Sequence, residues 1–429
     1  MTTRARGVPG LILALVFLAG TLHAVSYAFT FPPWAIEDEQ QHVDYVWRLA
    51  NDHRLPNLDD QIDDSIIDGV VKADRWDAYG LSPPGEPTAD AMGLEARSYT
   101  AYHPPLGYVA LAPVAMVAGD DPTTVLYALR LAMAAAAGGV CLLAAMLAAR
   151  WQGPGPPRQA AVALGTGLTV AALPALAESG GRVNTDILAA VAVLAGTLVT
   201  LRWLDRPTAN RAWSVGAVLA AATLTRETTI VLAVPVLIAA LVVHGRAELR
   251  RADMARMVGP PVVAGAAWAV MTRIATGRFD GSEAFLQRYV SPLPAATGDR
   301  FASGINAGRV LLPFGRWAVP LVVLLAVPVV ITVGLVLAGR AGRAVPVAMA
   351  VGVLIAQTLV LAVQVNRGLN VVTARLMLPS YPLLIAAAVV GWATVRRWTA
   401  TFVPALAAAA LGLWFFVVDF VTRFPPRIG

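Results

Sequence analysis

The sequence LILALVFLAGTLHAVSYAF at residues 11–29, followed by TFPPWAIEDEQQH at residues 30–42, decides how the rest of the chain is interpreted. The first stretch is apolar over roughly 20 residues, the length that an α-helix needs to cross a bilayer. It is longer than the apolar core of a signal peptide, so we expect a retained membrane helix. Asp38 and Glu39 follow a few residues beyond its end. Because ionisable groups near a membrane are costly and usually functional, this carboxylate pair is our first candidate site.

Composition predicts the class of protein. Of the 429 residues, 57% are hydrophobic and only 14% are charged, with a mean hydropathy of +0.63. Soluble domains are far less apolar, so we expect one polytopic integral membrane domain over residues 1–429. The net charge of +6 comes almost wholly from arginine. Basic residues beside membrane helices orient them or contact lipid headgroups, so nucleic acid is not an expected partner. The single cysteine, Cys141, excludes a disulfide within the chain.

Apolar windows, separated by charge, Pro and Gly, predict an all-α transmembrane bundle of about 11–12 membrane elements. They fall near residues 8–29, 104–119, 124–149, 159–177, 187–204, 212–225, 229–243, 257–275, 317–338, 344–365, 376–395 and 399–421. Arginines in the short connections predict the cytoplasmic side: Arg4, Arg6, Arg150, Arg158, Arg202, Arg206, Arg211, Arg246, Arg250, Arg251, Arg256, Arg340, Arg343, Arg396 and Arg397. Residues 31–102 and 276–316 then form two large outer loops of a plasma-membrane protein.

The crossings near the first loop must satisfy a parity condition. If residue 103 and residues 178–186 lie outside and 150–158 inside, then an odd number of crossings separates residues 104 and 149. Two windows compete for that one crossing. We expect residues 104–119 to form a short interfacial or re-entrant element; an additional turn, or an outward loop at Arg150, would also satisfy the count.

The first outer loop, residues 31–102, holds more than half of the 27 acidic residues. It is too short to form an independent domain with a sizeable core. Within it, Asp38, His42, Tyr45 and Leu49 are spaced so that they share one face of a helix. We therefore expect amphipathic helices at the membrane surface. His42 and Tyr45 either complete that surface or serve the site.

Four arginines lie in outward connections, where the orientation rule gives no reason for positive charge: Arg182, Arg226, Arg367 and Arg375. Such groups at a dry boundary need an anion, from either a carboxylate or a ligand phosphate. Arg226 has Glu227 beside it, and Arg182 has Glu178 and Asp186 nearby, so structural pairing is an alternative for both. Arg375 has no nearby acid in the sequence, which favours a ligand role, whereas Arg367 is interpreted as a headgroup anchor. Asp186 is either a functional acid or a cap for the helix that follows it.

Five short motifs, in order over residues 32–379, together resemble one known family. They are PPWAIEDEQQHVDY at 32–45, YHPPL at 102–106, RVNTD at 182–186, LTRE at 224–227 and RLMLP at 375–379. The first is similar to the first outer loop of the GT-C glycosyltransferases that use polyprenyl-phosphate sugars, such as protein mannosyltransferases and aminoarabinose transferases. The last departs from the family pattern, with Leu376 in place of tyrosine.

The resemblance implies roles for individual residues. Asp38 matches the catalytic base, with Glu39 beside it, and Asp186 matches the acid of the second outer loop. His103, Arg182, Arg226 and Arg375 are implied to bind the donor phosphate, with His103 at a place where some relatives have a lysine. His42, Tyr45 and Tyr102 are implied to contact the acceptor or the sugar.

The expected function is an inverting glycosyl transfer from a polyprenyl-phosphate sugar to a hydroxyl of a glycan, lipid or protein acceptor, on the extracytoplasmic side. An oligosaccharide ligase or polymerase with a lipid-pyrophosphate donor is the main alternative. A secondary transporter is the other, although the internal repeats typical of transporters are not evident. No cofactor is certain. A divalent cation stays open at Asp38, Glu39 and Asp186, while the acidic run Asp59, Asp60, Asp63 and Asp64 is better explained as a solvated face.

Overall fold

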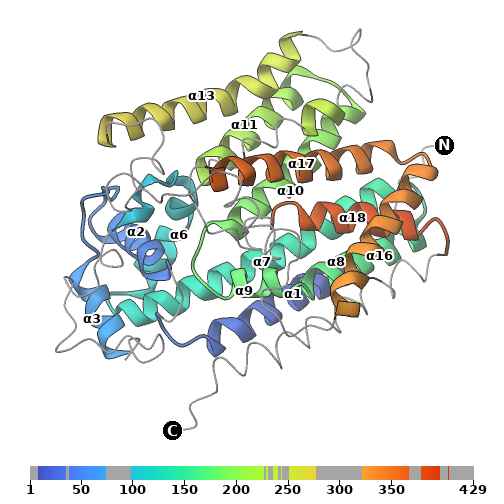
Figure 1. The fold of residues 1–429 in the computed structure, drawn as a ribbon. Helices are drawn as coiled ribbons and strands as arrows, with labels where there is room; N and C mark the ends of the chain where they lie inside the picture. The colour runs from blue at the N-terminus through green and yellow to red at the C-terminus, as the bar shows by residue number, and fades with distance from the viewer. Residues whose placement is uncertain are drawn as a thin grey trace.

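The computed structural model describes residues 8–34, 38–73, 98–226, 229, 235–239, 243, 251–276, 321–366, 378–396 and 404. Within those ranges the chain forms helices and no β-strand, so the all-α prediction is confirmed (Figure 1). In chain order the elements are α1 (Gly10–Thr30), α2 (Glu39–Asn51), α3 (Asp64–Lys72), the 3-10 helix η2 (Tyr99–Tyr102), α6 (Leu106–Ala118), α7 (Pro122–Gln152), α8 (Pro156–Ala171), α9 (Pro174–Gly180), α10 (Asp186–Asp205), α11 (Ala209–Thr225), α13 (Arg251–Thr276), α16 (Leu321–Arg340), α17 (Ala344–Asn366) and α18 (Tyr381–Trp392).

Helix α1 packs against α7 and α8 through small residues. A Cβ atom placed on Gly20 of α1 would lie 3.2 Å from the Cα atom of Gly138 on α7. A Cβ atom placed on Gly167 of α8 would lie 2.5 Å from the Cβ atom of Val16 on α1. Glycine lets helix backbones approach closely, which strengthens packing where lipid removes the hydrophobic drive to associate.

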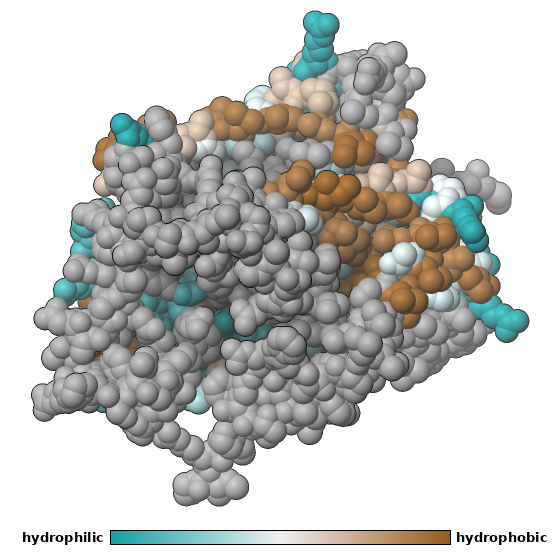
Figure 2. Space-filling view, viewed as in Figure 1, coloured by the Kyte–Doolittle hydropathy of each residue, from teal (hydrophilic) through white to brown (hydrophobic). Residues whose placement is uncertain are grey.

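Several described helices fit a membrane span. Helices α1, α7, α10 and α13 are long and apolar enough to cross, and α8 with α9, bent by 65° at their junction, would make a fifth span. Both α1 and α13 expose large apolar side chains, among them Leu11 at 71% and Ile274 at 81%, as lipid-facing helices do. Figure 2 shows hydrophobic residues spread over the described part of one face. The predicted element 399–421 lies almost wholly outside the described residues.

The length of α6 bears on the parity condition. Its 13 residues extend about 20 Å, which is less than the roughly 30 Å thickness of the hydrocarbon core. By contrast, the 31 residues of α7 extend about 46 Å, more than enough for a crossing. These lengths support the interpretation of residues 104–119 as a short element that leaves the crossing to α7.

The two ends of the bundle differ in chemistry. Helices α2, α3 and α6 gather at one end of α7, at the left of Figure 1. At the other end, Arg150 pairs with Asp205, and Arg343 donates to the carbonyl of Gln152 at 3.0 Å. These two arginines are among those that the sequence predicts to be cytoplasmic.

A buried carboxylate joins the described segments between residues 38 and 98. Asp44 of α2 is fully buried and accepts from Nε of Arg48 at 3.0 and 3.1 Å, from the backbone N–H of Asp63 at 2.9 Å and from the hydroxyl of Ser98 at 2.7 Å. Burial raises the pKa of Asp44, and these donors oppose the rise. Because the partners come from three positions in the chain, Asp44 ties the described segments around Asp63 and Ser98 to α2. Helix α2 is therefore enclosed from Glu39 to Arg48, more deeply than a surface helix requires.

Candidate functional site

Asp38 stands at the junction between α1 and α2. Its backbone φ is 70°, in the left-handed region that residues other than glycine rarely adopt. Helix α2 begins at the next residue, Glu39, so the predicted helix is present with Asp38 immediately before it. Unusual backbone conformations of this kind persist only where the surrounding structure holds them, and they cluster at functional sites.

Glu39 is held by Arg130 of α7. Nε and Nη2 of Arg130 donate to the two carboxylate oxygens of Glu39, at 2.9 and 2.5 Å. Nη1 donates to the carbonyls of Ala28 and Phe31, both at 2.9 Å, and Nη2 also donates to the carbonyl of Pro32 at 3.1 Å. A guanidinium has five N–H groups, and these five contacts use them all. Both side chains of the pair are fully buried.

Arg130 is a site residue that the sequence analysis missed. It lies inside the predicted apolar window 124–149, where an ionisable residue normally faces the interior and has a partner. The position of Arg130 in an apolar window could therefore have identified it. The sequence could not, however, identify Glu39, 91 positions away, as the partner of Arg130.

Asp186, the first residue of α10, pairs with Arg226. Nη1 of Arg226 contacts Oδ1 of Asp186 and donates to the hydroxyl of Thr185 at 3.1 Å. Both charged side chains are largely buried, with 4% of Asp186 and 13% of Arg226 exposed. The side chain of Asn184 accepts from the backbone N–H of Asp186 at 2.8 Å. Asn184 therefore serves the start of the helix, and the Asp186 side chain faces Arg226.

Histidines and tyrosines from three segments form a second cluster. Nδ1 of His42 lies 2.8 Å from the hydroxyl of Tyr108, and the His42 and His103 rings stack with centroids 6.1 Å apart. Tyr45 stacks on Tyr108 at 3.8 Å and donates to the carbonyl of His103 at 3.2 Å. Burial raises the pKa of Tyr45, which keeps its phenol protonated as a donor. Tyr102 adjoins this cluster, with its ring centroid 4.3 Å from that of His103.

The start of α6 links the histidine and tyrosine cluster to the segment that carries Asp186. A Cβ atom placed on Gly107 would lie 3.3 Å from the methyl carbons of both Thr185 and Thr225. These threonines immediately precede Asp186 and Arg226. The first turn of α6, four residues after His103, is therefore packed between the start of α10 and the end of α11.

The four arginines predicted to face outward differ in their partners and in whether the structure describes them. Arg182 is largely buried and lies 3.7 Å from the carboxylate of Glu178, so one of the structural pairings anticipated for it is present. Arg226 pairs with Asp186, which the sequence analysis considers only for Arg182. The partner expected for Arg226, Glu227, lies outside the described residues, as do Arg367 and Arg375.

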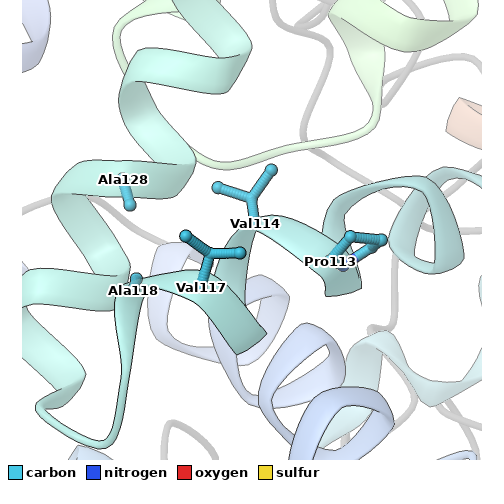
Figure 3. Close-up of a pocket in the computed structure, with 5 residues that line it drawn as sticks. All are labelled: Pro113, Val114, Val117, Ala118 and Ala128. Atoms are coloured by element: carbon cyan, nitrogen blue, oxygen red, sulfur yellow. The ribbon is translucent and has the colours of Figure 1, made fainter.

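Among the described residues there is no group of three or more His, Cys, Asp or Glu side chains placed to hold a metal ion. An open apolar pocket of about 360 Å³ lies between the second half of α6 and α7 (Figure 3). The pocket is lined by Pro113, Val114, Val117, Ala118 and Ala128. None of these is a predicted site residue.

Comparisons with known proteins bear on the fold. No family model matches the sequence, and no curated protein matches it. The structure is similar to that of ArnT from Cupriavidus metallidurans in complex with undecaprenyl phosphate, with a TM-score of 0.55 and 16% sequence identity. The match covers 94% of this chain and 64% of the ArnT chain, so this chain spans less than two thirds of that protein. The likeness confirms the fold that the five motifs predict: the chain is a polytopic helical membrane protein with a GT-C-like fold.

Proposed function

We propose that this protein is an inverting glycosyltransferase, which moves a sugar from a polyprenyl-phosphate donor to an acceptor hydroxyl on the extracytoplasmic side of the plasma membrane. The observation that carries the proposal is the gathering of acids and cations from distant segments at one end of an apolar bundle. Glu39, Asp186 and Arg226 are joined there through buried contacts. The likeness to a protein crystallised with undecaprenyl phosphate supports the choice of donor lipid.

The reaction needs a base on one side of the sugar and cations on the other. Asp38 takes the proton of the acceptor hydroxyl as its oxygen attacks the anomeric carbon. The bond between that carbon and the phosphate oxygen breaks, and polyprenyl phosphate leaves with one more negative charge than it carried in the diester. A positioned carboxylate base contributes about 10²–10⁴-fold to such a step.

Cations near the phosphate stabilise the charge that develops there. Both described contacts of Arg226 are made through Nη1, and the rest of its guanidinium is proposed to bind the phosphate. His103, Arg182 and Arg375 are the other proposed phosphate ligands, and His42 and Tyr102 the proposed acceptor contacts. Tyr45, stacked and fully buried, is proposed to act by holding His103. The apolar pocket beside α6 is a candidate place for part of the isoprenoid chain.

The proposal is tested with the full chain reconstituted in sealed vesicles, supplied with a panel of radiolabelled polyprenyl-phosphate sugars and acceptor glycans, lipids and peptides. Asp38→Asn should lower transfer by at least about 10²-fold. Asp68→Asn is the matched control, because Asp68 is an exposed carboxylate of α3 in the same loop. Unchanged turnover in Asp38→Asn would remove Asp38 from the mechanism. Transfer only from a lipid-pyrophosphate oligosaccharide would identify a ligase, and solute uptake without use of the donor would identify a transporter.

A further inference from the structure

We infer that Arg130 and Glu39 form a positioning pair. The pair fixes the segment at Asp38 and the segment at Asp186 in position relative to each other. The inference rests on the proposed function for its catalytic consequence. The contacts themselves, however, are those of the described structure. It assigns to Glu39 a role different from that of a second catalytic acid.

The contacts of the pair leave neither residue able to take part in chemistry. Both oxygens of Glu39 bind Arg130, and Oε1 also accepts from the backbone N–H of Val183 at 3.1 Å. Glu39 is 1% exposed, so a proton could reach its carboxylate only if these contacts broke. Arg130 likewise has each of its five N–H groups committed, so it offers no donor to a phosphate.

The same contacts connect both acids. On one side, Glu39 follows Asp38 directly, and fixing its carboxylate holds the left-handed backbone of Asp38. On the other side, Val183 is followed by Asn184, whose side chain donates to the carbonyl of Ser179 at 2.7 Å and accepts from the N–H of Asp186. A chain of polar contacts therefore runs from α7 through the start of α2 to the start of α10.

A purely stabilising purpose does not explain such a pair. Removing two charges from water is expensive, and apolar residues of similar volume often stabilise a protein as well or better. A buried ion pair is better explained where it specifies one arrangement of segments over others. Here the segments specified are those that carry the proposed base and the second acid, where a displacement of about 1 Å can cost 10²-fold in rate.

The test compares Glu39→Gln and Arg130→Lys with the wild-type chain reconstituted in nanodiscs. Gln places an amide N–H₂ against a guanidinium donor, and Lys has too few donors for the five acceptors. We expect either change to lower kcat for transfer from the polyprenyl-phosphate sugar by about 10²-fold. The Kd for undecaprenyl phosphate should change by less than about threefold, and the number of binding sites per chain should stay the same. The double variant should be no worse than the poorer single variant, because the two residues act as a unit.

Amide hydrogen exchange supplies a readout that does not depend on activity. Each variant should raise exchange in both residues 38–43 and residues 182–188, whichever partner is changed. The matched control is Arg48→Lys, which alters the other buried arginine–carboxylate pair of α2 and should leave kcat and exchange in residues 182–188 unchanged.

The outcomes separate the two proposals. Wild-type turnover in Glu39→Gln, or unchanged exchange in residues 182–188 in both variants, would overturn the inference. Loss of turnover in Glu39→Gln alone, with Arg130→Lys fully active, would make Glu39 a catalytic acid and would also overturn it. If the wild-type chain transfers no sugar from any donor, the proposed function fails, and the exchange data alone decide whether the pair couples the two segments.

Discussion

Two neighbouring glycines of α7 allow a direct test of the packing between α1 and α7. A Cβ atom added to Gly138 would lie 2.6 Å from the backbone carbonyl oxygen of Phe17 and would also clash with Thr21. A Cβ atom added to Gly139 would meet only Cγ2 of Val191, at 4.0 Å, which is ordinary contact. The obstacle at Gly138 includes backbone, so a change of side-chain rotamer cannot relieve it. We predict that Gly138→Ala destabilises the protein and that Gly139→Ala does not.

The magnitude follows from two opposing terms. Gly→Ala inside a helix stabilises by roughly 0.5–1 kcal/mol through the unfolded chain, and this gain is common to both positions. Overpacking in a tight interface costs about 1–3 kcal/mol, and only Gly138 incurs it. The difference between the two variants isolates the steric term, so Gly139→Ala should be about 1–3 kcal/mol more stable than Gly138→Ala.

The measurement is unfolding in mixed micelles with increasing SDS, followed by tryptophan fluorescence, with the wild-type chain as reference. The unfolding midpoint should fall for Gly138→Ala and stay or rise for Gly139→Ala. Equal midpoints for the two variants would refute the close approach of α1 and α7 at Phe17.

Two further predictions concern the first outer loop. Asp44→Asn should destabilise the protein by about 3 kcal/mol, because it removes the buried carboxylate that accepts from Nε of Arg48. In the same assay Asp52→Asn, which changes a partly exposed pair 3.7 Å from Arg48, should cost about 1 kcal/mol or less. For sidedness, a cysteine introduced as Asp68→Cys should react with an impermeant maleimide added to intact cells, whereas one introduced as Arg206→Cys should react only after permeabilisation. Cys141 is fully buried and should add little background, and the reverse labelling pattern would contradict the predicted orientation.

Much of the helical layout could be predicted from the sequence, because the bilayer imposes its requirement locally. The apolar windows 124–149 and 187–204 correspond to α7 and α10 within a few residues at each end. The amphipathic spacing after Asp38 predicts α2, but it does not predict how deeply α2 is enclosed. That enclosure depends on α3, η2 and α6 folding over it, around Asp44, which is a tertiary property.

The partners of the charged residues were harder to predict. Proximity in sequence favours Glu227 for Arg226, whereas the structure pairs Arg226 with Asp186, 40 positions away. The same limit applies to Glu39, which the sequence presents as one half of a catalytic pair and the structure holds against Arg130. Ion pairs between helices depend on which helix faces meet, and hydrophobic periodicity does not specify that choice.

The two ion pairs also determine how charge is distributed in the proposed site. Glu39 with Arg130 is neutral as a unit, and so is Asp186 with Arg226. A phosphodiester donor brings one negative charge and an ionised Asp38 another. During transfer the phosphate gains negative charge while Asp38 takes a proton, so the demand for positive charge grows on the phosphate side.

That demand favours an arginine with no acidic residue near it in the sequence. Arg182 lies 3.7 Å from Glu178, which reduces what it offers a phosphate. Arg375 lies in a stretch of sequence with no acidic residue between Asp299 and Asp419. If the proposed function holds, Arg375→Gln should therefore lower kcat/KM for the lipid donor more than Arg182→Gln does, measured side by side in the vesicle assay. An equal or smaller loss at Arg375 would mean that the developing charge is met by the arginines already paired with acids.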